Sequence, residues 1–147
     1  MASPKKGVRK VIAVRHGDVG GGANPSLSAA GIARAQQLVH VLEGVAAARI
    51  LVSDLARTQQ TAAPLALASG LTPVVLPAAD IDGYVAATNA LPLGATVVVI
   101  GHSNTVPAII GKFTGLSLAD IPADEFDRLY VAVGTHHVEL RYGATSS

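Results

Sequence analysis

The stretch Val11-Ile12-Ala13-Val14-Arg15-His16-Gly17 decides the fold, because a short aliphatic run ends abruptly at charged and polar residues. A continuous run rich in β-branched residues, with no polar alternation, is typical of a strand buried on both faces in the centre of a parallel sheet. Arg15 and His16 would then stand at the carboxyl end of a central strand, which is the edge where parallel sheets bind ligands.

The alternation of strand and helix continues along the chain and ends in a hairpin. We expect strands over 11–14, 49–52, 73–76 and 96–100, helices over 28–44, 54–70, 80–90 and 104–113, and hairpin strands over 129–133 and 136–142. Ser28 and Gly44 are the expected caps of the first helix, with Ile32 on its buried face, and Ser53 or Asp54 is the expected N-cap of the second. Right-handed crossovers between such strands predict an α/β three-layer sandwich: a mostly parallel central sheet with helices on both faces.

The composition indicates one folded domain with no bulk attraction to polyanions. Half of the 147 residues are hydrophobic and 14% are charged, which excludes a disordered chain, and a net charge of +1 favours neither nucleic acid nor an anionic membrane as a partner. We expect a basic, flexible tail over 1–9, a single domain over 10–143 and a solvated surface loop over 117–128. No aliphatic run is long enough for a membrane span or a signal peptide, so we expect a cytoplasmic protein, with the reservation that a removed leader would leave no trace.

Polar side chains follow three of the expected parallel strands, as Arg15-His16-Gly17, as 53–57 and as 101–104. Two arginines and two histidines therefore meet at one edge of the sheet. Arg57 falls in the first turn of a helix, where the helix dipole disfavours a cation by about 0.3–1 kcal/mol unless an anion is bound there. Arginine also presents a planar fork that suits phosphate oxygens, so Arg15 and Arg57 are candidate clamps for a phosphoryl group.

His16 is the candidate nucleophile of this site. A histidine with a pKa near 6.5 is largely neutral at physiological pH, and one ring nitrogen attacks phosphorus when a carbonyl fixes the other as a donor. Gly17 would let the backbone approach the phosphate closely. His102 would form a hydrogen bond to a phosphoryl oxygen and, if protonated, would help to neutralise its charge. The remaining candidate phosphate ligands are Ser103, Asn104 and, in the glycine-rich loop, Asn24.

Four blocks of sequence, in this order, resemble the histidine phosphatase superfamily. They are Val14-Arg15-His16-Gly17, Leu27–Gly31 with Arg34-Ala35, Ser53–Thr58 with Thr61-Ala62, and Gly101-His102-Ser103. The resemblance spans residues 11 to about 113 and implies a phosphoglycerate mutase-like fold, nearest to the short bacterial phosphatases. It also implies a phosphohistidine intermediate on His16, phosphate binding by Arg15, Arg57 and His102, and no metal or cofactor. The implied substrate is a phosphorylated small molecule or phosphoprotein, including phosphohistidine, with inorganic phosphate as the product.

The chain departs from the family pattern at the proton donor. Members with a dedicated acid carry it before the last parallel strand, often in an insertion that also forms a lid, and here only 78–94 is available. Asp82 is the candidate acid, with Asp80 behind it, and capping of the short helix explains both carboxylates equally well. Position 18, often glutamate in the mutases, is Asp18. The absence of a lid favours a phosphatase over a mutase, which must keep its phosphoenzyme away from water.

Three rival readings come from other classes of protein. A non-catalytic module that binds phosphate or a phosphopeptide would use the same clamp. The run 101–105 is similar to the nucleophile elbow of a serine hydrolase, but Thr105 stands where that motif needs glycine. A metal site is disfavoured because arginines lie beside His16 and would repel a cation, and because His136 and His137 point to opposite faces of a strand.

Overall fold

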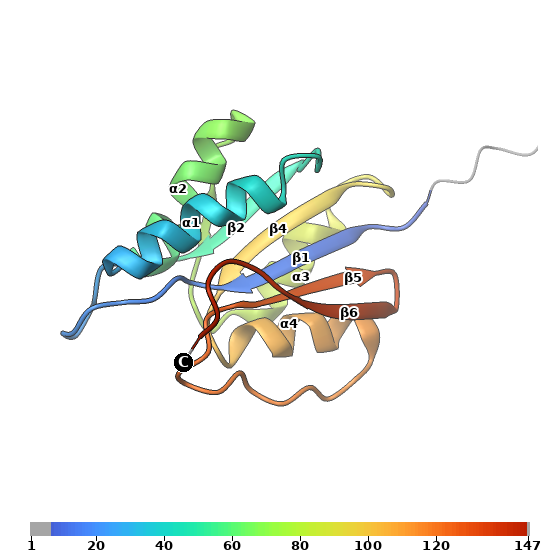
Figure 1. Ribbon diagram of the computed structural model, residues 1–147. Coiled ribbons are helices and arrows are strands. Elements are labelled where there is room, and N and C mark those ends of the chain that lie inside the picture. The colour runs from blue at the N-terminus through green and yellow to red at the C-terminus, as the bar shows by residue number, and fades with distance from the viewer. Residues whose placement is uncertain (1–6, 147) are drawn as a thin grey trace, which may run out of the picture.

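Strands and helices alternate in the computed structural model, which describes residues 7–146 (Figure 1). The elements are β1 (Lys10–Arg15), α1 (Ala29–Val41), β2 (Arg49–Ser53), α2 (Ala56–Ser69), β3 (Val74–Leu76), α3 (Ile81–Asn89), β4 (Thr96–Gly101), α4 (Thr105–Thr114), β5 (Arg128–Val133) and β6 (His136–Arg141). The predicted α/β architecture is confirmed, and every expected element is present within a few residues of its expected bounds.

The six strands form one mixed sheet in the order β3-β2-β4-β1-β5-β6. The first four in that order are parallel, and β5 and β6 add an antiparallel hairpin beyond β1. In the register of β1 and β4, Arg15 lies opposite Gly101. The residues that follow these two strands therefore leave the sheet side by side.

A hydrophobic layer packs on each face of the sheet. Alternate residues of β1 face opposite ways: Ile12 packs in the cluster that includes Leu38 of α1, and Val11 in the cluster that includes Ile109 of α4. Figure 1 shows α1 and α2 on one face and α3 and α4 on the other. All six residues of β4 are buried, as expected of a central parallel strand with helices on both sides.

Of the two caps predicted for α1, only the N-terminal one is present in the structure. The side chain of Ser28 accepts a hydrogen bond from the backbone of the first turn, as predicted. The helix ends at Leu42 and not at Gly44, because the Leu42 side chain turns into the core and its N–H closes the last turn. Ile32 is 55% exposed, contrary to expectation; Arg34, two residues later, is buried in its place.

The start of α2 also differs from the prediction. Its N-cap is Leu55, with no side-chain hydrogen bond, and neither Ser53 nor Asp54 caps it. Asp54 instead accepts a hydrogen bond from the backbone N–H of Ala78 at 3.1 Å, and this bond holds the loop before α3 against the end of β2. At the other end, Gly70 takes the left-handed conformation expected of a C-cap, with φ of 70°.

The first six residues of the predicted tail lie outside the described part of the chain. Arg9, the last residue of the predicted tail, is among the described residues. It donates from Nε to the carbonyl of Leu91 at 2.8 Å and from Nη2 to the carbonyl of Asn89 at 3.0 Å. Between residues 7 and 146, no helix is long and apolar enough to cross a membrane.

Candidate active site

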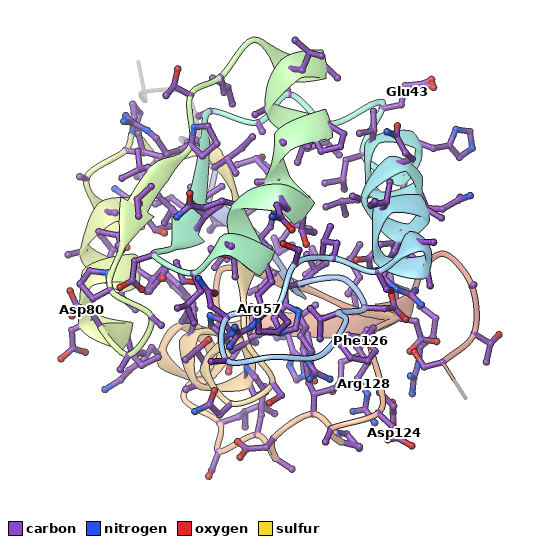
Figure 2. The ribbon with its side chains drawn as sticks, turned by 90° about the vertical axis from the view of Figure 1, so that its left-hand side faces the viewer. Glu43, Arg57, Asp80, Asp124, Phe126 and Arg128 are labelled. Atoms are coloured by element: carbon purple, nitrogen blue, oxygen red, sulfur yellow. The ribbon has the colours of Figure 1, made fainter. Side chains whose placement is uncertain are left out.

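A hollow of about 300 Å³ opens at the carboxyl edge of the parallel strands. It is lined by Arg15, His16, Leu55, Arg57, Ala78, Ala79, His102, Ser103, Asn104 and Thr105. The structure thus brings together the two arginines and two histidines that the sequence places after three separate strands. Figure 2 shows Arg57 on the face of the molecule where β2 ends and α2 begins.

His16 is buried and fixed by backbone groups on two sides. The backbone N–H of His16 donates to the carbonyl of Gly101 at 2.9 Å, and the ring Nδ1 lies 2.8 Å from the carbonyl oxygen of Gly17. Because a carbonyl oxygen only accepts, Nδ1 carries the proton and Nε2 keeps its lone pair. Burial, assisted by the nearby charge of Arg15, lowers the pKa of His16 to about 4, so the ring is neutral near pH 7.

Two glycines allow the chain after His16 to pass close to α1. A Cβ on Gly17 would lie 2.9 Å from the carbonyl oxygen of Gly31, and a Cβ on Gly31 would overlap the carbonyl oxygen of Asp18. The Asp18 carboxylate then accepts from Nε of the buried Arg34 at 2.7 Å. Close backbone packing and a partly buried ion pair together fix the segment that positions His16.

Arg15 is held by the loop that precedes β5. Its Nη1 donates to the carbonyls of Ala123 at 2.9 Å and Glu125 at 2.7 Å, and its guanidinium lies 4.0 Å from the centre of the Phe126 ring. Its Nε is buried and has no hydrogen-bond partner in residues 7–146. Since an unpaired buried donor costs about 1–3 kcal/mol, an acceptor that reached this N–H would stabilise the site.

Two helices begin at the hollow without side-chain caps. Leu55 before α2 and Asn104 before α4 make no capping hydrogen bond with their side chains. The first N–H groups of a helix carry partial positive charge and need acceptors. With Arg57 in the first turn of α2, these groups make the hollow suited to an anion.

His102 lies across the hollow from His16, with 5.4 Å between the ring centres. Its backbone N–H donates to Thr105 Oγ1 at 2.9 Å, and its ring Nε2 lies 2.9 Å from Ser53 Oγ. Burial, followed by the charge of Arg57, lowers the pKa of His102 to about 4. Both imidazoles are therefore neutral at physiological pH, beside two permanent cations.

Comparison with known families agrees with this geometry. The family model described as histidine phosphatase superfamily (branch 1) matches residues 11–80, which include Arg15, His16 and Arg57. Over these residues the chain is similar to the histidine phosphatase superfamily. No curated protein sequence matches it significantly.

Solved structures share the fold of this chain over nearly its whole length. The protein histidine phosphatase SixA complexed with tungstate is 22% identical, with a TM-score of 0.70, and the match covers 93% of this chain and 96% of SixA. A mycobacterial glucosyl-3-phosphoglycerate phosphatase is 16% identical, also with a TM-score of 0.70, and the match covers 95% of this chain and 100% of that protein.

The other predicted site residues lie outside the hollow. Asn24 is exposed in the glycine-rich loop. Asp80 accepts from the backbone of Gly83 as the N-cap of α3, and it lies well to the side of Arg57 in Figure 2. The Asp82 side chain is 89% exposed and lies 3.7 Å from Lys112. Among the described residues, no carboxylate lines the hollow and no group of three metal-ligating side chains occurs.

Sequence reasoning missed Phe126, which packs against both Arg15 and His16. Its ring centre is 5.9 Å from that of His16, and it belongs to the loop that we expected to be solvated surface. The chain has only two phenylalanines and three tyrosines, so an aromatic residue in an acidic loop was the available signal. Aromatic rings bury large areas and rarely lie in a loop without a packing partner.

Proposed function

We propose that this chain is a histidine phosphatase, which transfers a phosphoryl group from its substrate to Nε2 of His16 and then to water. The observation that supports the proposal is a buried, neutral imidazole, which the carbonyl of Gly17 fixes through Nδ1 and whose Nε2 has no hydrogen-bond partner in residues 7–146. Around it stand Arg15, Arg57 and two helix starts without side-chain caps, and these supply positive charge for phosphoryl oxygens.

The reaction proceeds in two displacements at phosphorus. In the first, the lone pair of His16 Nε2 forms a bond to phosphorus, the bond from phosphorus to the leaving oxygen or nitrogen breaks, and the leaving group takes a proton from solvent. In the second, water attacks the phosphohistidine, the P–N bond breaks, and inorganic phosphate leaves. Arg15 and Arg57 hold the phosphoryl oxygens throughout and neutralise the charge that they carry, and His102 lies beside them in the hollow.

The lining of the hollow favours a substrate that leaves without a strong acid. Asp82 and Asp80 lie outside the hollow, and no carboxylate among residues 7–146 lines it to protonate an alkoxide leaving group. Aryl phosphates and phosphohistidine leave readily and need little help from an acid. We therefore propose a phosphohistidine-bearing protein as the preferred substrate class, because the open site admits a bulky substrate. Small phosphomonoesters should be hydrolysed more slowly.

The decisive experiment compares the wild-type protein with His16→Ala, using His40→Ala on the exposed side of α1 as the matched control. Each protein is incubated with an aryl phosphate, a phosphohistidine-bearing protein and an alkyl phosphate, and acid-labile phosphoenzyme is trapped by rapid quench. We expect turnover and phosphoenzyme in wild type and the control, and neither in His16→Ala.

Absence of turnover in wild type between pH 5 and 8 would contradict the proposal. If inorganic phosphate or a phosphopeptide still raised the melting temperature, the second candidate, a non-catalytic phosphate-binding module, would be favoured. That candidate rests on the same anion-binding features, because binding requires no attack by His16.

A further inference from the structure

Two buried hydroxyl groups lie behind His102 and form a chain to its ring. Ser53 Oγ is 2.9 Å from His102 Nε2 and 2.8 Å from Thr58 Oγ1. Both hydroxyl side chains belong to fully buried residues and neither lines the hollow. Their hydrogen bonds therefore act on the ring of His102 and do not contact a ligand directly.

A count of protons gives the direction of these hydrogen bonds. Thr58 Oγ1 lies 3.0 Å from the carbonyl of Leu55 and 3.1 Å from the carbonyl of Ser53, and its single proton is drawn to these oxygens because carbonyls only accept. The Thr58 oxygen already accepts from the backbone N–H of Ser53 at 3.1 Å, and its other lone pair accepts the Ser53 hydroxyl proton. Ser53 Oγ then has lone pairs left for the backbone N–H of Leu55, at 3.3 Å, and for the ring of His102.

We infer that Ser53 and Thr58 hold neutral His102 with its proton on Nε2, so that His102 turns a bare Nδ1 toward the phosphoryl group. Nδ1 has no hydrogen-bond partner among residues 7–146, and the ring lines the hollow. The two histidines are thus fixed in opposite tautomers, since His16 carries its proton on Nδ1. The tautomer stands independently of catalysis, whereas its role toward the phosphoryl group rests on the proposed function.

The opposite tautomers give the two rings different tasks. Nε2 of His16 is bare and reacts with phosphorus. Nδ1 of His102 is bare and accepts the proton of a protonated phosphoryl oxygen, so that one proton is shared between that oxygen and Nδ1 in the complex. Ser53 and Thr58 are positioning residues in this scheme, because they act on the phosphoryl group only through His102.

The test is a long-range ¹H–¹⁵N correlation spectrum of the resting protein at neutral pH, without ligand, in which the two ring nitrogens of each histidine report the tautomer. His→Gln variants assign the signals. We expect Nε2–H for His102 and Nδ1–H for His16. A proton on Nδ1 of His102 in the wild type would overturn the inference, and this result needs no variant to fold.

Two variants of Thr58 test the direction of the chain. In Thr58→Val the acceptor for the Ser53 hydroxyl is lost, so that hydroxyl donates to Nε2 and His102 shifts to the Nδ1–H tautomer. Thr58→Ser keeps the hydroxyl and should keep the wild-type tautomer. An unchanged tautomer in a folded Thr58→Val protein would refute the role of the pair. The spectra need no turnover, so they remain informative even if the phosphatase proposal fails.

Kinetics then connect the tautomer to catalysis. With an aryl phosphate, we expect Thr58→Val to lower kcat/KM by about 10²-fold, which is the lower end of what a positioned proton acceptor contributes, because Nδ1–H cannot accept the proton of the phosphoryl oxygen. Thr58→Ser should stay close to wild type. A loss in Thr58→Ser as large as that in Thr58→Val would contradict this role, because Thr58→Ser keeps the hydroxyl.

Discussion

Acidification from pH 8 to pH 5 should destabilise this protein through His16. Burial, with help from the charge of Arg15, lowers the pKa of His16 to about 4 in the folded protein, whereas a histidine in an unfolded chain has a pKa of about 6.5. The folded pKa is the lower one, so the unfolded chain binds more protons between these values. The stabilisation is complete above pH 6.5 and is lost as the pH falls toward 4.

The size of the effect follows from the two pKa values. At pH 5 the unfolded imidazole is about 97% protonated and the folded one about 9%, which shifts the folding equilibrium roughly 30-fold, or about 2 kcal/mol. The pKa of His102 is lowered to a similar value by burial and by Arg57. The wild type should therefore lose between about 2 and 4 kcal/mol, since the two rings titrate as a coupled pair.

The variant that isolates His16 is His16→Asn, because an asparagine amide donates to the carbonyl of Gly17 and does not titrate. Urea unfolding at pH 8 and pH 5, in a buffer free of phosphate, should show a loss about 2 kcal/mol smaller in His16→Asn than in wild type. His40→Asn, at an exposed position of α1, is the control for removal of a histidine. If wild type and His16→Asn lost the same stability within 0.5 kcal/mol (roughly the additivity error of such measurements), the pKa assignment would be refuted.

Three further changes test other parts of the structure. Gly31→Ala should lower the free energy of unfolding by about 1–3 kcal/mol, because its methyl group would overlap the carbonyl oxygen of Asp18; an unchanged urea midpoint would contradict this. Phe126→Ala removes the ring 4.0 Å from Arg15, and we expect KM to rise about 2- to 30-fold with kcat little changed; steady-state kinetics with an aryl phosphate decide. Asp82→Asn should leave kcat within about twofold, because this side chain is 89% exposed; a loss of about 10²-fold would identify it as the general acid.

The parts of the site that sequence predicted are those that depend on strand order alone. The aliphatic runs of β1 and β4 identify central strands, and parallel strands end at one edge, so His16 and His102 had to lie near each other. This prediction needs only the order of the strands and no distance between the two histidines. The same reasoning placed Arg57 at the edge, because β2 pairs with β4.

Phe126 could not be placed in this way, because its position depends on a long connection. The segment from α4 to β5 has no periodicity, and its path follows from contacts such as the bond from Ile121 N–H to the carbonyl of Ser103, at 2.8 Å. That bond brings the loop over the end of β4 and carries Phe126 to Arg15. Long-range contacts of this kind leave no local pattern in the sequence.

Ser53 shows why local rules fail at the site itself. A serine directly before the expected helix over 54–70 predicts an N-cap, which would stabilise α2 by about 1 kcal/mol. Its hydroxyl instead lies against His102 and Thr58, and α2 begins without a side-chain cap. Because the Ser53 hydroxyl does not cap α2, it fixes the ring of His102, and the first N–H groups of α2 stay open to an anion. The local stability lost at this helix start is therefore the condition for the chemistry proposed beside it.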